Sequence, residues 1–244
     1  MSKSFAGIIT GLRLEARIAR SGCGRHARVA CHGMGPKRAR EAAEELARAG
    51  AAGLVSFGLA AGLVAQAKPG MLLLPARIVT ESGGSIMTDI LWRERLAGAL
   101  QKALPVLDQP LASVKRPLPS YLDKASAWAR TQAFAADMES AAIAAVARRR
   151  GLPFIALRAI ADPVDFSLPP AAVLAINKNG RLNIRKLLLS LWRQPAQWRA
   201  LKELAGHSKA AKGALKTACH GAGDAMAAPG GIPHALRARH PLKP

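Results

Sequence analysis

Cysteine is scarce in this sequence, and its three copies form no recognisable pattern. Cys23, Cys31 and Cys219 are odd in number, include no CxxC pair and follow no secretory signal. These features argue against a disulfide framework and against a structural zinc site. The apolar stretch at residues 5–10 is too short for the core of a signal peptide and predicts a strand instead. We therefore expect a protein of the reducing cytoplasm, without a metal site.

Long apolar runs are also missing. The longest run without a charged residue covers residues 49–67, and glycine interrupts it at positions 50, 53, 58 and 62. A transmembrane helix needs about 20 consecutive apolar residues, whereas glycines at this spacing indicate a strand, a tight turn and the start of a helix. The run therefore predicts no transmembrane span.

Acidic residues are few, since 15 Asp and Glu stand against 36 Lys and Arg and leave a net charge of +21. This excess favours encounters with anions such as phosphate, nucleic acid or an acidic membrane face. A genome that encodes Arg and Ala often would produce the same excess without a functional reason, and the charge alone does not separate the two explanations.

Aromatic residues make up 4% of the chain, and Tyr121 is its single tyrosine. Proteins that bind single-stranded nucleic acid usually stack bases on aromatic side chains, and no nucleic-acid-binding motif accompanies the basic charge here. We therefore do not expect a nucleic acid partner. A basic protein that binds membranes or nucleic acid without catalysis stays the alternative from another functional class.

The abundant residues are Ala, Leu, Val and Ile, and they alternate between strand and helix patterns. A helix is predicted to begin at Pro36 and to stop at Gly50, because its apolar positions recur at helical spacing. This β-α-β rhythm with short loops predicts an α/β fold. The predicted strands cover residues 5–10, 28–32, 53–58, 70–80, 111–115, 133–137 and 153–161, and further helices cover 91–103, 120–130 and 139–150.

The chain changes character after residue 170. Helices are predicted at 171–177, 182–192, 195–205 and 208–219, and the second and third of these combine apolar and basic faces. Such helices either cover the sheet or make peripheral contact with an anionic membrane at the inner face. From Gly221 onward Gly, Pro, Ala, His and Arg dominate without periodicity. We expect a catalytic domain at 1–220 and a basic, disordered tail at 221–244.

Carboxylates follow several of the predicted strands. Glu15 comes after the first strand, Asp137 and Glu139 lie at a strand–helix junction, and Asp162 ends the strand that carries Arg158. Open α/β sheets bind their ligands beyond the carboxyl ends of the strands, and two acids in different environments suit general acid and base catalysis. Each acid taken singly also fits a helix cap or a turn.

Five segments in this order resemble the nucleoside phosphorylase and nucleosidase superfamily. They are GIITGLRLE (7–15), HGMG (32–35), GLAAGL (58–63), ADMESAA (136–142) and LRAIAD (157–162), within a resemblance that runs over residues 5–164. Among subgroups, GIITGLRLEARIA, LVSFGLAAGL and AADMESAAIAAVA are most similar to the hopanoid-associated phosphorylases. The resemblance implies a single-domain nucleoside-phosphorylase-like fold, with a twisted mixed sheet flanked by helices.

The activity implied by the resemblance is cleavage of the N-glycosidic bond of a purine nucleoside. For the subgroup this means phosphorolytic removal of adenine from adenosylhopane, a lipid-linked nucleoside, in hopanoid biosynthesis. The alternative is a hydrolytic nucleosidase of the methylthioadenosine and S-adenosylhomocysteine type. The resemblance also implies a homo-oligomer, and neither reaction needs a cofactor.

The resemblance assigns roles to particular side chains. Asp162 matches the general acid that protonates N7 of the departing purine, a role that fits because a protonated base leaves more easily. Glu139 matches the carboxylate that binds the ribose 2′ and 3′ hydroxyls, and Met138 matches the side chain that packs against the sugar. Asp137 and Arg158 are expected to line the base pocket.

The nucleophile is expected to be phosphate, and water is the alternative. Glu15 matches the residue that activates water in the nucleosidase branch, whereas the basic charge favours phosphate as a co-substrate. GLAAGL departs from the superfamily pattern, with Leu59 where serine is frequent and Ala61 where glycine is common. The candidate phosphate-binding residues are Arg13, Arg25, Lys37, Arg38 and Arg77, with the backbone amides of Gly33, Gly35, Gly58, Leu59, Ala60 and Ala61.

Overall fold

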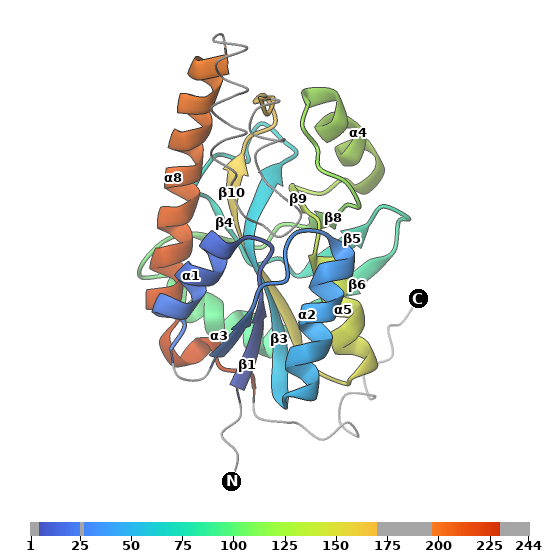
Figure 1. Cartoon of the computed structure of the whole chain (residues 1–244), viewed down its shortest axis with the longest axis vertical. Coiled ribbons are helices and arrows are strands. Elements are labelled where there is room, and N and C mark those ends of the chain that lie inside the picture. The colour runs from blue at the N-terminus through green and yellow to red at the C-terminus, as the bar shows by residue number, and fades with distance from the viewer. Residues whose placement is uncertain (1–4, 25–26, 170–196, 230–244) are drawn as a thin grey trace.

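Alternating apolar strands and amphipathic helices build a layered α/β structure, in which helices flank a ten-stranded mixed sheet (Figure 1). The computed structural model describes residues 5–24, 27–169 and 197–229. The predicted fold class is confirmed. The strands are β1 (Phe5–Ile9), β2 (Ala27–Ala30), β3 (Ala51–Gly62), β4 (Leu72–Leu73), β5 (Arg77–Thr80), β6 (Ser85–Met87), β7 (Val106–Leu107), β8 (Leu111–Ser113), β9 (Ala135–Asp137) and β10 (Phe154–Asp162). The helices are α1 (Arg13–Gly22), α2 (Pro36–Arg48), α3 (Ile90–Leu100), α4 (Tyr121–Thr131), α5 (Ser140–Arg149), α8 (Gln197–Ala222) and the 3-10 helix η1 (Gly223–Met226).

The long strand β3 connects the parts of the sheet. Its first half pairs in parallel with β1 on one side, residues 54–61 pair in parallel with β10 on the other side, and its last two residues pair antiparallel with β9. The strand order along the sheet is β6-β5-β8-β9-β3-β10-β4-β7, and β2 lies outside β1. Because β1 ends at Ile9, opposite Ser56, β3 and β10 continue past it. The sheet is therefore open on that side at the middle of β3.

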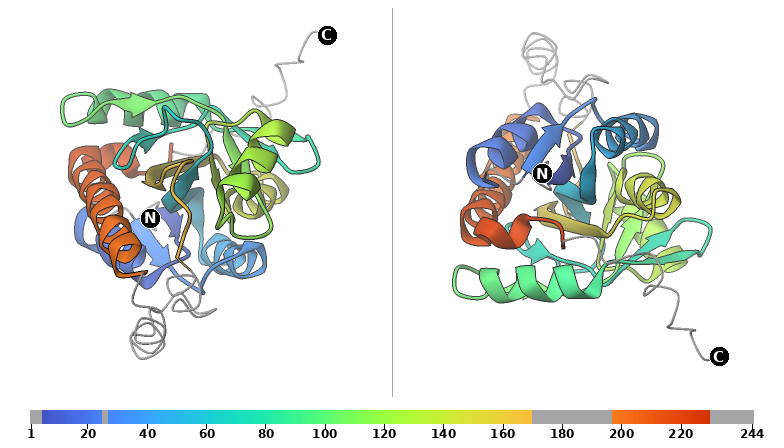
Figure 2. Two further views of the ribbon diagram at one scale, coloured as in Figure 1. Left: turned by 90° about the horizontal axis from the view of Figure 1, so that it is seen from above. Right: turned by 90° about the horizontal axis from the view of Figure 1, so that it is seen from below.

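Successive residues of β3 face opposite sides of the sheet, as the strand period of two requires. Leu54 and Ala60 join the core under α2 and α5, whereas Val55 and Phe57 join the core under α1, α3 and α8. Figure 2 shows these two groups of helices on either side of the strands. A smaller apolar cluster lies under α4 and contains Ala127. Beyond the end of β1, the middle of β3 is left open to the loops above the sheet.

Helix α8 packs along α1 and β10 through one apolar stripe. Ala211, Leu215, Ala218 and Ala222 recur at helical spacing and are buried. Gly22 permits the close approach, because a Cβ there would lie 2.6 Å from Cβ of Cys219. The Sγ atoms of Cys23 and Cys219 are 2.8 Å apart, and this contact together with burial raises the pKa of the Cys219 thiol. The two thiols therefore act as buried packing groups.

Several elements differ from the sequence prediction. The single strand predicted at 70–80 is two strands, β4 and β5, with Pro75 between them, and proline cannot donate a hydrogen bond to a sheet ladder. Helix α1 and the short strands β6 and β7 were not predicted. The helices predicted at 195–205 and 208–219 form one helix, α8, because Gly206 lies on its exposed side and does not break it.

Residues 221–229, which the sequence assigned to a disordered tail, are part of the fold. Met226 and Ala228 are buried in the core, and Nε1 of Trp92 donates a 3.2 Å hydrogen bond to the carbonyl of Ala225. The helices predicted at 171–177 and 182–192, and the rest of the predicted tail, lie outside the described residues. Within the described parts of the chain, no helix is long and apolar enough to cross a membrane.

Candidate active site

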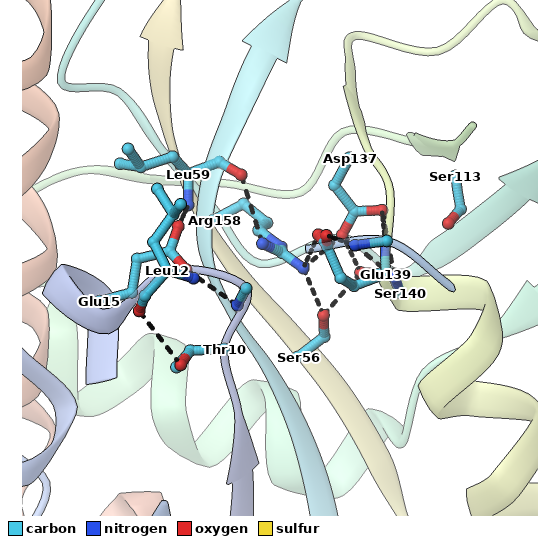
Figure 3. A network of polar contacts seen from close by, with 12 residues as sticks. Thr10, Leu12, Glu15, Ser56, Leu59, Ser113, Asp137, Glu139, Ser140 and Arg158 are labelled. Carbon is cyan, nitrogen blue, oxygen red and sulfur yellow. Dashed lines mark hydrogen bonds and ion pairs between the residues drawn. The ribbon is translucent and has the colours of Figure 1, made fainter. Parts of the chain in front are cut away.

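Polar side chains gather just beyond the end of β1, where the chain turns over the middle of β3 (Figure 3). Glu15, Ser56, Asp137, Glu139 and Arg158 come from α1, β3, β9, the start of α5 and β10. All five are less than 9% exposed. Such a cluster is stable only when charges and hydrogen bonds are paired, so its partners define what each group can do.

Glu15 lies in the first turn of α1 and binds backbone amides on both sides of the site. Its Oε2 accepts hydrogen bonds from the amides of Gly11 (3.0 Å) and Leu12 (2.8 Å), which caps its own helix. Its Oε1 accepts from the amide of Leu59 in β3 at 2.9 Å. Gly58 makes this possible, because a Cβ there would lie 2.5 Å from Oε1 of Glu15. Both sequence interpretations of Glu15, cap and site residue, are thus compatible with its geometry.

The buried position of Glu15 changes its acidity. Burial raises the pKa of its carboxyl from 4.5 to about 7, although Arg158 and the amides of Leu59 and Leu12 act in the opposite direction. A carboxylate with a pKa near neutrality can accept a proton during a reaction and release it afterwards. Glu15 is therefore suited to act as a general base.

Arg158 is the cation at the centre of the cluster, in register with Gly58. Its Nη2 contacts Oγ of Ser56 at 2.6 Å, Oδ2 of Asp137 at 2.6 Å and Oε2 of Glu139 at 3.4 Å. Burial alone would lower its pKa, but Asp137, Glu139 and Glu15 together raise it. The guanidinium therefore stays charged and neutralises part of the acid cluster.

Asp137 accepts hydrogen bonds from the N-terminus of α5. Its Oδ1 accepts from the amides of Glu139 (3.3 Å) and Ser140 (3.2 Å), and its Oδ2 also accepts from the Ser140 hydroxyl. That hydroxyl lies 2.9 Å from Oγ of Ser56. Asp137 and Arg158 are thus held by each other and by this network, and their expected contact with a base stays a prediction.

Glu139 is the N-cap residue of α5 and lies among three loops. Its Oε1 accepts a 2.9 Å hydrogen bond from the amide of Gly35, which has a φ of 95° that favours glycine. A Cβ at Gly11 would lie 3.2 Å from the same oxygen. Burial raises the pKa of Glu139, Arg158 lowers it, and the nearby Asp137 raises it further. Met138 is half-buried, and its Cε lies 4.0 Å from the position of a Cβ on Gly35.

Asp162 lies at the far end of β10, beyond an irregularity that places it opposite Ala61. It comes four positions after Arg158, which corresponds to roughly 13 Å along a strand. Its Oδ1 is 2.9 Å from Nζ of Lys124, a lysine of α4 that is fully buried. Burial raises the pKa of Asp162, and Lys124 and, more weakly, His207 oppose that rise.

Lys124 and Ser56 are site residues that the sequence prediction missed. A signal for Lys124 exists, because Lys124, Ala127 and Thr131 share the buried side of α4 at spacings of three and four residues. A lysine on an apolar stripe has to find a buried partner. Ser56 carries no such signal, since a serine in a buried strand is common.

The residues proposed for phosphate lie on several elements of the described part of the chain, and Arg25 lies outside it. Arg13 on α1 and Arg77 on β5 are exposed. The amides of Gly35 and Leu59 donate to Glu139 and Glu15, and Ala60 and Ala61 pair with β10. Gly33, with a φ of 114°, lies in the turn before α2. Beside this turn lies a hollow lined by His32, Lys37, Arg38 and Glu41.

No group of three His, Cys, Asp or Glu side chains in the described residues is arranged to hold a metal ion. The carboxylates define the chemistry that this site can perform. They can bind hydroxyls, accept a proton at Glu15 and deliver one at Asp162.

One protein family and several solved structures are similar to this chain. The model of the Phosphorylase superfamily matches residues 17–192. No curated protein sequence matches the chain.

Solved structures share its fold. The futalosine hydrolase of Helicobacter pylori strain 26695 is 16% identical, with a TM-score of 0.67, and the match covers 92% of this chain and 97% of that one. The 5′-methylthioadenosine/S-adenosylhomocysteine nucleosidase of Neisseria meningitidis, in complex with methylthio-immucillin-A, is 17% identical, with a TM-score of 0.64 and coverages of 89% and 98%. The corresponding nucleosidase of Helicobacter pylori is 15% identical, with a TM-score of 0.67 and coverages of 91% and 97%.

Proposed function

The chain belongs to the phosphorylase superfamily and is an enzyme of the nucleoside phosphorylase and nucleosidase type, and from this we propose that it hydrolyses the N-glycosidic bond of a purine nucleoside. The environment of Glu15 is the observation that favours water as the nucleophile. Three backbone amides hold this buried carboxyl, and burial raises its pKa to about 7. The neighbouring solved structures support the base, since one nucleosidase was crystallised with 5′-methylthioadenosine and another with adenine.

We assign to Asp162 the protonation of the base as it leaves. The glycosidic bond breaks through an oxocarbenium-like state, and a proton given to the purine stabilises the leaving group. A well-placed general acid contributes about 10²–10⁴-fold to such a step. The raised pKa of Asp162 supports this role, because a proton is then more readily available near neutral pH.

We assign the binding of the sugar to Glu139 and Met138. Oε1 of Glu139 accepts from the amide of Gly35 and Oε2 lies 3.4 Å from Nη2 of Arg158, and the remaining lone pairs of the carboxylate can accept from ribose hydroxyls. A carboxylate at this place also favours positive charge on the sugar ring. Met138 offers an apolar surface beside it.

Charge supports water over phosphate as the nucleophile. In the described residues Arg158 faces Asp137, Glu139 and Glu15, so the cluster already holds more negative than positive charge. A phosphate dianion would have to lose its hydration shell beside these carboxylates, which is costly without further cations. Water carries no such cost, and Glu15 can take its proton.

Phosphorolysis is the second candidate. The hollow beside Gly33 supports it, because Lys37 and Arg38 line the hollow at the start of α2 and could attract an anion. Phosphate would then attack the sugar, and Glu15 would bind a hydroxyl instead of activating water.

The most specific part of the proposal is the 5′ substituent that the sugar of the nucleoside carries. The sequence resemblance favours adenosylhopane, and Tyr121, Leu122 and Trp128 on α4 are exposed apolar residues on the helix that contacts Asp162. A hydrophobic substituent could pack there. Methylthioadenosine is the smaller alternative. Cytoplasmic location, homo-oligomer formation and peripheral contact with an anionic membrane stay proposals from the sequence.

The test is incubation of the purified protein with adenosylhopane and with methylthioadenosine, each with and without inorganic phosphate, followed by product masses. We expect free adenine and a free sugar at equal rates in both buffers. Adenine release that requires phosphate, with a sugar 1-phosphate as product, would replace hydrolysis by phosphorolysis. Absence of adenine in every reaction would reject both.

A further inference from the structure

Lys124 is the one fully buried lysine among the described residues, and all of its donors are used. Its Nζ donates to Oδ1 of Asp162 at 2.9 Å and to the carbonyls of Pro163 and Phe166 at 2.6 Å each. An ammonium group has three protons, and here each has an acceptor. The lysine is therefore charged and fixed in position.

The two carboxylate oxygens of Asp162 differ in their hydrogen bonds. Oδ1 accepts from the ammonium group, whereas no donor from the described residues contacts Oδ2. The Asp162 side chain retains 11% exposure, so one part of it faces open space. A proton on the carboxyl would repel the ammonium group if it were on Oδ1, and it therefore belongs on Oδ2.

We propose that Lys124 is a positioning residue that holds Asp162 by Oδ1, so that Oδ2 carries the proton and delivers it to the leaving purine. The inference rests on the proposed function. In that step the Oδ2–H bond breaks while a bond from hydrogen to the purine nitrogen forms. The electron pair of the glycosidic bond goes to the base, and water bonds to the sugar carbon while its proton goes to Glu15.

The charge of Lys124 serves the same step. Asp162 becomes a carboxylate when its proton leaves, and a buried carboxylate without a counter-charge is unfavourable. Lys124 from α4 supplies that charge, and His207 from α8, which is 3.9 Å from Glu203, adds a weaker one if protonated. Without Lys124, burial would raise the pKa of Asp162 further and make it a poorer acid.

The test compares Lys124→Gln with the wild type on two substrates. One is an adenine nucleoside, and the other is a 7-methylpurine nucleoside, whose base is already cationic and needs no proton to leave. We expect kcat for the adenine nucleoside to fall at least about 10-fold, with a smaller change in KM, because acid catalysis is impaired. We expect kcat for the 7-methylpurine nucleoside to change less than about threefold. The alkaline limb of the adenine pH profile should move to higher pH.

Two further variants separate positioning from stability. Thr131→Val removes a 2.7 Å hydrogen bond to Ala127 on the same buried stripe of α4, and it should lower stability without moving the pH profile. Lys124→Arg keeps the charge, and its alkaline limb should stay at the wild-type pH while kcat for the adenine nucleoside falls. Should Lys124→Gln not fold, the arginine variant carries the test, and unchanged kcat per folded molecule would overturn the inference.

Equal losses of kcat on both substrates in Lys124→Gln, with an unmoved pH limb, would show that the lysine is merely structural. That result would leave the proposed function intact. A wild-type protein that cleaves neither nucleoside would instead overturn the proposed function.

Discussion

At the scale of single residues, one guanidinium balances the buried acids. Arg158 contacts Ser56, Asp137 and Glu139 within 3.4 Å, and its side chain is 2% exposed. Removing one partner of a buried charged network leaves the other charges without compensation, and this commonly costs about 3–5 kcal/mol. The cluster therefore contributes to stability through its completeness and not through any single contact.

The variant Arg158→Met measures this dependence. We expect its free energy of unfolding to fall by about 3–5 kcal/mol, as measured by denaturant unfolding. Arg149→Met is the matched control, because Arg149 pairs with Glu44 at the surface and such pairs contribute about 0–1 kcal/mol. Equal losses in the two variants would contradict a special role for Arg158.

Glu15 predicts a defined dependence on pH. If it is the general base, kcat/KM rises with pH through about 7, the pKa set by its burial, because the carboxylate is the active form. Glu15→Gln should lose at least about 10²-fold in kcat, since an amide cannot accept the proton. A wild-type activity profile that is flat between pH 5 and 9, measured by initial rates, would argue against the assignment.

The same pKa has a consequence for stability. The folded protein keeps the proton of Glu15 to a higher pH than the unfolded chain, whose value is near 4.5. Stability from this group is therefore complete below about 4.5 and is lost as pH rises through about 7, by roughly 3 kcal/mol in total. The stability of the wild type relative to Glu15→Gln should fall across this window.

Several site residues could be predicted at the residue scale because they follow strands. Asp137 and Arg158 lie in β9 and β10, Glu139 follows β9 as the N-cap of α5, and Glu15 follows β1 in the first turn of α1, and the topology brings them together. The pairing of Asp162 with Lys124 could not be predicted in this way. It depends on how α4 packs over the end of β10, a contact between segments 38 residues apart.

At the scale of elements, two glycines differ in the space that surrounds them. Gly58 lies under Glu15, where a Cβ would come within 2.5 Å of the carboxylate and 2.8 Å of the guanidinium of Arg158. Gly213 lies on the exposed side of α8, with no atom within 4 Å of a built Cβ. The same substitution should therefore have opposite effects at the two positions.

We expect Gly213→Ala to raise the free energy of unfolding by about 0.5–1 kcal/mol, because alanine loses less conformational entropy in a helix. Gly58→Ala should lower it by about 1–3 kcal/mol through overpacking, and should reduce kcat as Glu15 is displaced. Thermal unfolding together with initial rates checks both. Normal activity in Gly58→Ala would contradict the close contact with Glu15.

Elements with regular patterns were predictable, and those decided by distant contacts were not. The spacing of Ala39, Ala42, Ala43 and Leu46 predicts α2, whose buried face they form. Helix α1 was missed because the prediction took Glu15 as a residue after a strand and did not assign its apolar positions. The strands β6 and β7 are two or three residues long, too short for a periodic pattern.

At the scale of the whole molecule, the fold extends past the predicted boundary at residue 220. Composition indicates a tail after Gly221, yet Met226 packs into the core with Trp92. Composition reports the average of a segment, whereas one large apolar side chain is enough to anchor a short one. The net charge of +21 favours the binding of anions, yet Arg13 and Arg77 are exposed and the described site is acidic.

Base release by Asp162→Asn tests the proposed chemistry most directly. The variant removes the counter-charge of Lys124, so we expect a lower melting temperature, and rates should be measured well below it with the folded fraction determined by circular dichroism. The account predicts that kcat for adenine release falls at least about 10²-fold per folded molecule, with a smaller change in KM. Adenine release at a near wild-type rate would contradict it and would remove Asp162 from the reaction.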